Sequence, residues 1–221
     1  MQTHELAILP SVLSANFAHL ESDLKRVESA GAKILHLDIM DGHFVPNISF
    51  GPNVVKTINS ISSLTLDTHL MIERPDQYLE HFKEAGADIL TVHVEACTHL
   101  HRTITKIKEL GMKAGVSLNP STSLSTIQEI LPYTDLILIM SVNPGFGGQK
   151  FIESSLTKIK SLAAMIAEQK LKTIIEVDGG LDLKTIKSVI DAGAHYLVAG
   201  NAVFGSADIE SNFTILNSYI K

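Results

Sequence analysis

A predicted strand over residues 34–40 carries polar side chains on one of its faces. Side chains alternate between the two faces of a strand, so His36, Asp38 and Met40 point one way while leucine and isoleucine point the other. The segment 66–71 repeats the pattern and places three chemically similar side chains together on one face: Asp67, His69 and Met71. The leucine faces can pack against helices, which leaves the polar faces to point inward.

These inward groups are candidates for a metal site. A later strand ends in a further carboxylate, Asp178, and the combined set has two imidazoles and two carboxylates: His36, Asp38, His69 and Asp178. A single strand histidine is more often a hydrogen-bonded core residue, but several unpaired ionisable groups in one interior are costly unless a cation offsets their burial. We expect one divalent ion, either zinc, iron(II), manganese or cobalt.

The strand over 89–94 offers a second pair, since His93 and Glu95 share a face. Alternation alone leaves both open as further ligands, although buried histidines usually have structural partners. Asp41, which follows the first polar strand, is interpreted as a loop or capping carboxylate.

Glycine-rich segments follow three late strands and form a second candidate site. Glycines let backbone N–H groups approach an anion, and the following helix N-termini favour negative charge, so these loops could hold one phosphate together. The residues expected to bind phosphate are Gly145, Phe146, Gly147, Gly148, Gly179, Gly180, Gly200 and Asn201. A nearby lysine or arginine is not required if backbone amides bind the anion.

A phosphate site and a metal site in one pocket suggest a small phosphosugar as substrate. A metal that polarises a ketone acidifies the neighbouring C–H bond and favours an enediolate. If Asp38 and Asp178 act from opposite faces, one removing and one returning a proton, the result is inversion at a single carbon. Three methionines could shield that intermediate from water or simply fill core space: Met40, Met71 and Met140.

Eight apolar strand-like segments alternate with eight segments of helical periodicity along the chain. The predicted strands cover 6–9, 34–40, 66–71, 89–94, 114–118, 136–140, 173–177 and 196–199, and the predicted helices cover 17–27, 54–61, 78–85, 100–107, 124–131, 156–166, 183–190 and 209–220. An Ala-Gly-Ala sequence recurs at the end of three helices, where glycine suits a left-handed cap. Strict alternation predicts a parallel sheet in an α/β (β/α)8 TIM barrel, with an open doubly wound sheet as the alternative.

Composition limits the function classes. The 221 residues suit one catalytic domain over 1–221, and no linker interrupts them. The 18 basic and 24 acidic residues give a net charge of −6, which argues against nucleic acid as a partner. No apolar stretch approaches membrane-spanning length, and the first five residues show no leader-like pattern. With a single cysteine, Cys97, we expect a reducing, cytoplasmic location.

The chain resembles the ribulose-phosphate 3-epimerases over nearly its whole length. The resemblance is carried by several motifs: Ile8-Leu9-Pro10-Ser11, His36-Leu37-Asp38-Ile39-Met40-Asp41-Gly42-His43, His69-Leu70-Met71, His93-Val94-Glu95-Ala96, Asn143-Pro144-Gly145-Phe146-Gly147-Gly148-Gln149, Val177-Asp178-Gly179-Gly180 and Gly200-Asn201. Asn201 departs from the serine common in the family, and Asn16 from the common aspartate. Asn201 keeps hydrogen-bonding capacity, so we expect a modest effect.

The resemblance implies a ribulose-phosphate-binding TIM barrel that epimerises D-ribulose 5-phosphate to D-xylulose 5-phosphate in the pentose phosphate pathway. It implies that Ser11 contacts substrate, that His36, Asp38, His69 and Asp178 bind the metal, and that the two aspartates are the acid and base. His69 and the three methionines are also expected to face the substrate. The family further implies a homo-oligomer. Two alternatives stay open: a 3-epimerase for a six-carbon ketose phosphate such as D-allulose 6-phosphate, and a sensor or scaffold that binds metal and phosphate without catalysis.

Overall fold

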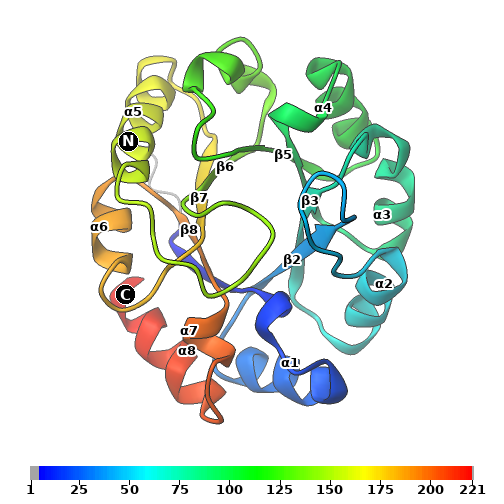
Figure 1. Cartoon of the computed structure of the whole chain (residues 1–221), viewed down its shortest axis with the longest axis vertical. Coiled ribbons are helices and arrows are strands. Elements are labelled where there is room, and N and C mark those ends of the chain that lie inside the picture. The colour runs from blue at the N-terminus through cyan, green and yellow to red at the C-terminus, as the bar shows by residue number, and fades with distance from the viewer. Residues whose placement is uncertain (1–4, 221) are drawn as a thin grey trace.

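In the described part of the chain, eight parallel strands form a ring that is enclosed by helices, as the computed structural model shows (Figure 1). The structure describes residues 5–220. The strands are β1 (Ala7–Pro10), β2 (Ile34–Met40), β3 (Thr65–Met71), β4 (Ile89–His93), β5 (Lys113–Leu118), β6 (Leu136–Met140), β7 (Ile174–Asp178) and β8 (Tyr196–Ala199). This confirms the predicted (β/α)8 TIM barrel, and the open-sheet alternative is wrong.

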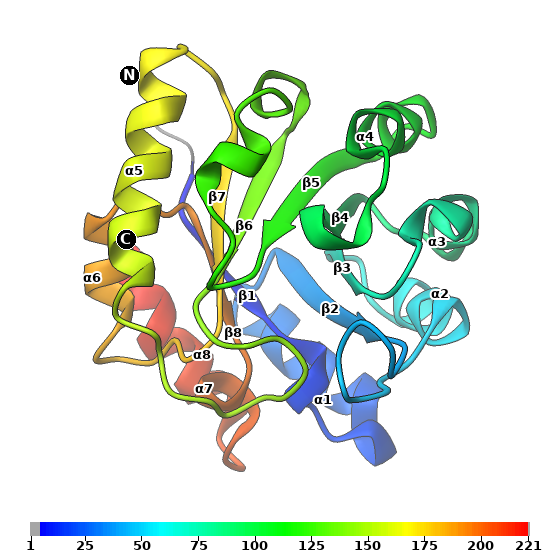
Figure 2. The same ribbon diagram turned by 45° about the horizontal axis from the view of Figure 1, so that its top comes forward.

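Helices surround the strands on the outside of the ring (Figure 2). They are α1 (Leu20–Ser29), α2 (Pro52–Ile61), α3 (Leu79–Ala85), α4 (Leu100–Glu109), α5 (Ser155–Glu168), α6 (Ile186–Asp191), α7 (Asn201–Phe204) and α8 (Ile209–Asn217). At the end of α3, Gly86 has a φ of 102°, the left-handed conformation expected at the centre of an Ala-Gly-Ala repeat. The chain can therefore leave a helix and enter the next strand within a few residues.

The barrel is closed between its first two strands. Strand β1 pairs with β8, and Ser11, directly after β1, forms a parallel bridge with His36 of β2. The register of β2 against β3 sets Asp38 opposite His69 and Met40 opposite Met71. Two polar strands are thereby aligned so that their inward side chains meet at the same depth.

The apolar core lies between the strands and the helices. Leu35 and Leu37 of β2 are fully buried and belong to the same apolar cluster as Leu24 and Val27 of α1. Burial of one such side chain contributes about 1.5–3 kcal/mol. The barrel interior differs from this apolar core because it contains buried polar side chains. His36, for example, is fully buried there. The fold thus holds ionisable side chains rigidly inside an apolar shell.

The predicted helix over 124–131 is wrong. That segment contains short 3₁₀ helices at Leu124–Ile127 and Leu131–Tyr133. Ser123 caps the first of them through its side chain, and Pro132 has no N–H with which to continue a helix. Serine, threonine and proline in this segment therefore outweigh its apolar spacing.

Within residues 5–220, no helix is both long and apolar enough to cross a bilayer. The expectation about a leader rests partly on Met1–His4, which lie outside the described residues.

Candidate active site

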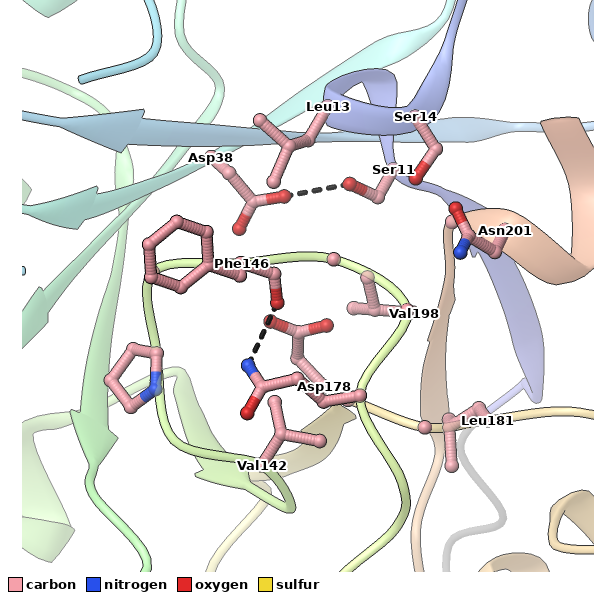
Figure 3. A pocket seen from close by; sticks show the side chains of 18 of the residues that line it. Ser11, Leu13, Ser14, Asp38, Val142, Phe146, Asp178, Leu181, Val198 and Asn201 are labelled. Carbon is pink, nitrogen blue, oxygen red and sulfur yellow. Dashed lines mark hydrogen bonds between the residues drawn. The ribbon is translucent and has the colours of Figure 1, made fainter. Parts of the chain in front are cut away.

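A cavity of about 310 Å³ opens where the strands β2, β6, β7 and β8 end. Its lining includes predicted residues from both sites, namely Ser11, Asp38, Met40, Met71, Met140, Gly145, Phe146, Gly147, Gly148, Asp178, Gly179, Gly180, Gly200 and Asn201. Figure 3 shows Asp38 and Asp178 reaching into this cavity, with Ser11 bonded to Asp38. The two predicted sites are therefore parts of one pocket.

The four predicted metal ligands lie together. His36, Asp38, His69 and Asp178 each offer one ligand atom, and these atoms lie within 4.8 Å of one another. Both histidines are fully buried beneath the cavity and are not part of its lining, whereas Asp178 is partly exposed to it. The cluster thus forms the floor of the pocket.

Two nitrogen atoms in this cluster indicate that a cation fits it. Nε2 of His36 and Nδ1 of His69 are buried and have no hydrogen-bond partner within residues 5–220. They lie 3.4 Å and 3.5 Å from the same oxygen, Oδ1 of Asp38. Buried polar atoms are rarely left unpaired, and two imidazoles with two carboxylates are the donors that zinc and similar ions bind. The residues present therefore suit one divalent ion.

The two aspartates differ in their electrostatic surroundings. Burial opposes ionisation of Asp38, but His36 and His69 outweigh it and hold the pKa of that carboxyl far below its ordinary value. Burial raises the pKa of Asp178 to about 7, with a further contribution from the charge on Asp38. Two carboxyl groups with separated pKa values can take opposite roles in proton transfer.

His36 lies beside two carboxyl groups that the sequence interpretation did not assign. Its Nδ1 lies 2.6 Å from Oδ2 of Asp67 and 3.0 Å from Oε1 of Glu176. Both carboxylates are fully buried in the barrel interior. With Nδ1 committed to Asp67, Nε2 of His36 is the nitrogen left for a cation. The sequence signal for the role of Asp67 was its position on the inward face of its strand.

His93 and Glu95 are not members of the metal-binding groups found among the described residues. Nε2 of His93 instead lies 2.8 Å from Nε2 of His69, and Nδ1 of His93 lies 3.1 Å from Oε2 of Glu95. Asp41 accepts hydrogen bonds from the backbone N–H groups of His43, Phe44 and Glu73, as expected for a loop carboxylate.

Three methionines and one leucine provide the apolar part of the cavity wall. Met40, Met71 and Met140 are almost fully buried, and Leu13 packs with the first two. Both expected roles are compatible with this placement, because these side chains fill core space and face the cavity at once. An enclosed apolar wall excludes water from a reacting carbon.

The glycine loops approach one another on the other side of the cavity. A Cβ added at Gly180 would lie 2.4 Å from the backbone nitrogen of Phe151. A Cβ added at Gly200 would lie 2.6 Å from the hydroxyl of Ser14. At Gly180 the contact is with backbone and leaves room only for glycine, whereas at Gly200 it is with the Ser14 side chain. Among residues 5–220, no lysine or arginine lines the cavity, so the backbone amides and the Ser14 and Asn201 side chains are donors available there to an anion.

Two of the three glycine segments are not followed directly by a helix, which differs from the prediction. The long helix α5 begins at Ser155, well after Gly148, and α6 begins at Ile186, well after Gly180. Only α7 directly follows its glycine, and it is a single turn. The extended loops after β6 and β7 therefore present backbone groups rather than helix ends.

Comparisons with known proteins agree with this geometry. Residues 7–204 match the model of the ribulose-phosphate 3 epimerase family. The chain is 55% identical to the ribulose-phosphate 3-epimerase of Bacillus subtilis (strain 168), over 92% of this chain and 94% of that protein. It is 54% identical to the chloroplastic ribulose-5-phosphate-3-epimerase of Arabidopsis thaliana, over 92% and 73%.

The fold has wider relatives. The crystal structure of 3-hexulose-6-phosphate synthase from Salmonella typhimurium aligns with a TM-score of 0.74 at 16% identity, covering 97% of this chain and 98% of that one. At this identity the likeness concerns the barrel alone.

Proposed function

The chain belongs to the ribulose-phosphate 3-epimerase family and is an isomerase that epimerises ribulose 5-phosphate, and we propose that Asp38 and Asp178 are its paired acid and base. The supporting observation is that both carboxyl groups reach one cavity from β2 and β7, with separated pKa values. A single proton-transfer group would return the proton to the face from which it came. Two groups on different strands allow inversion.

The buried cluster could bind a metal ion, and we propose that His36, Asp38, His69 and Asp178 hold it. Zinc, iron(II), manganese and cobalt all accept this donor set. When bound, the ion would polarise the C2 carbonyl of the substrate and acidify the neighbouring C3–H bond. The unpaired nitrogens of His36 and His69 support this assignment.

Proton transfer then occurs between the substrate and the two aspartates. In one direction the first aspartate takes the C3 proton, which leaves the 2,3-enediolate of the substrate. The second aspartate, initially protonated, gives its proton to the opposite face of C3 and produces D-xylulose 5-phosphate. One C–H bond is broken and one is formed, and the aspartates exchange protonation states. The reverse reaction exchanges their roles.

The glycine loops orient the substrate in this scheme. We propose that Gly145 to Gly148, Gly179-Gly180 and Gly200-Asn201 bind its phosphate, which places C3 between the aspartates. The described part of the chain contributes no lysine or arginine to the lining, which supports binding by backbone amides. Ser11, His69 and the three methionines complete the proposed contacts with the sugar. Fixed orientation of this kind is a large part of catalysis for a small substrate.

The direct test is a coupled assay for xylulose 5-phosphate, run on native, chelator-treated and metal-restored enzyme. We expect activity to disappear on chelation and to return when zinc, iron(II), manganese or cobalt is added. Full activity in the chelated, metal-free protein would contradict the metal assignment while leaving the epimerase activity intact.

Three further properties are part of the proposal. We expect residues 1–221 to act as one catalytic domain, to work in the cytoplasm and to assemble as a homo-oligomer. Size-exclusion chromatography with light scattering tests the last point, and a monomer at assay concentration would contradict it.

A further inference from the structure

Three side chains form a hydrogen-bonded chain that ends at the metal-binding cluster. Nε2 of His69 lies 2.8 Å from Nε2 of His93, and Nδ1 of His93 lies 3.1 Å from Oε2 of Glu95. The other oxygen of Glu95, Oε1, accepts hydrogen bonds from the Asn119 backbone N–H and the Thr122 hydroxyl. We call His69, His93 and Glu95 the Glu95 chain.

The donors and acceptors in the Glu95 chain can be assigned in order. A neutral imidazole carries one N–H group, so one of the two facing Nε2 atoms donates and the other accepts. A carboxylate only accepts, which makes Nδ1 of His93 the donor toward Glu95. Nε2 of His93 is then an acceptor, and Nε2 of His69 must carry its hydrogen. The lone pair of His69 is left on Nδ1, the atom that faces Asp38.

We propose that His93 and Glu95 are positioning residues that fix the tautomer of His69 so that Nδ1 is free to bind the metal ion. This inference rests on the proposed metal site and adds two residues that act through His69. Both ring nitrogens of His93 are engaged, so His93 supports a ligand instead of serving as one.

The tautomer of the second histidine ligand, His36, is fixed by direct contact with a carboxylate. His36 presents Nε2 to the cluster because its Nδ1 contacts Asp67 directly, at 2.6 Å. His69 presents the opposite nitrogen and reaches its carboxylate, Glu95, through His93. Ligating histidines commonly give their second N–H to a carboxylate or carbonyl, and removal of such partners lowers metal affinity about 10–100-fold.

An isosteric substitution tests the order of donors. In Glu95→Gln, the amide oxygen would retain the Asn119 and Thr122 hydrogen bonds, which turns the NH₂ group toward Nδ1 of His93. That nitrogen must then accept, Nε2 of His93 donates, and the hydrogen of His69 moves to Nδ1, where the cation should bind. In Glu95→Ala, water can either donate to Nδ1 of His93 or accept from it, so the original order stays available and the cation can select it.

We therefore expect Glu95→Gln to bind Zn²⁺ about 10–100-fold more weakly than the wild type and more weakly than Glu95→Ala. The measurement is a Zn²⁺ titration of the chelated full-length chain against a chromophoric competitor. Ser117→Ala is the matched control: Ser117 is fully buried, pairs with His93 in the sheet and has an unpartnered hydroxyl. It should retain wild-type affinity.

A purely structural role gives the reverse order, because glutamine preserves more packing than alanine. Equal affinity of Glu95→Gln and wild type, or weaker binding by Glu95→Ala than by Glu95→Gln, would overturn the inference. If the wild type itself does not bind Zn²⁺, the proposed metal site fails instead, so the two failures are distinguishable.

A second measurement needs no variant. Nitrogen-15 spectra of the histidines in the Zn²⁺-loaded wild type distinguish the two tautomers. We expect the hydrogen on Nε2 of His69 and on Nδ1 of His93. A hydrogen on Nε2 of His93 would overturn the inference even if Glu95→Gln fails to fold.

Discussion

The hydroxyl of Ser11 donates a 2.6 Å hydrogen bond to Oδ2 of Asp38. Oδ1 of the same carboxylate faces Nε2 of His36 and Nδ1 of His69, so the two oxygens have separate surroundings. Ser11 follows β1 and forms the bridge that closes the barrel against His36. Barrel closure and orientation of the proposed catalytic carboxylate therefore depend on the same residue position.

Removal of this hydroxyl should impair catalysis without loss of the metal ion. We expect Ser11→Ala to lower kcat/KM about 10–150-fold, because hydrogen bonds to charged groups contribute about 1.5–3 kcal/mol. Steady-state kinetics and the zinc content of the same sample provide the measurement. Wild-type kcat/KM, or a zinc content that falls together with activity, would contradict this role for Ser11.

Asn201 should affect substrate binding more than the chemical step. The side-chain amide of Asn201 lies against Gly148, because a Cβ added at Gly148 would be 2.6 Å from Nδ2 of Asn201. Asn201 therefore joins its own loop to the loop that contains Gly148. In Asn201→Asp, a carboxylate beside the proposed phosphate site costs about 1 kcal/mol or more. We expect KM to rise about tenfold with a smaller change in kcat.

Asn201→Ser is the matched control for that measurement. Serine keeps a hydroxyl donor at the position, so KM should stay within a few-fold of the wild type. An equal increase in KM for both variants would argue against a charge effect and against phosphate binding at this loop.

The barrel and most of the pocket could be predicted because period-two alternation is a local property. Counting along one strand places His36 and Asp38 inward, and Asp178 is the carboxylate that ends a later strand. The structure brings all three to one cavity floor. Asp67 was assigned to the same inward face, but its contact with His36 depends on the register of β2 against β3. Register is a relationship between strands, which one sequence does not specify.

The Glu95 chain illustrates a further limit. Glu95 lies in a short 3₁₀ helix, Val94–Ala96, where strand alternation no longer applies. The bond between His93 and His69 joins two imidazoles, a pairing for which the sequence contains no local signal. The incorrect helix over 124–131 has a different cause, because its apolar spacing was helical while Pro132 and the serine-rich start favoured 3₁₀ turns.

A packing prediction tests the barrel wall independently of catalysis. A Cβ at Gly115 would lie 2.1 Å from Oγ1 of Thr91, its neighbour across the β4–β5 pair. We expect Gly115→Ala to lower the free energy of unfolding by about 1–3 kcal/mol, as overpacked cores do. Urea unfolding of the metal-free protein measures this change.

A double-mutant cycle separates the clash from a backbone effect. Because Thr91→Ala removes the side chain that would clash, Gly115→Ala should be less destabilising in that background than in the wild type. Additive effects of the two substitutions would mean that Thr91 does not limit the space at Gly115.

The proposed roles of Asp38 and Asp178 are tested most directly by hydrogen exchange in D₂O. Asp38→Asn and Asp178→Asn are each loaded with Zn²⁺, checked for metal content, and incubated separately with ribulose 5-phosphate and xylulose 5-phosphate. Proton NMR follows the C3 hydrogen. We expect epimerisation to fall about 10²–10⁴-fold in both variants. The remaining aspartate should still exchange the hydrogen of one epimer, and the two variants should exchange opposite epimers. Exchange of the same epimer by both metal-loaded variants, or epimerisation at the wild-type rate by either one, would contradict catalysis by two opposed aspartates.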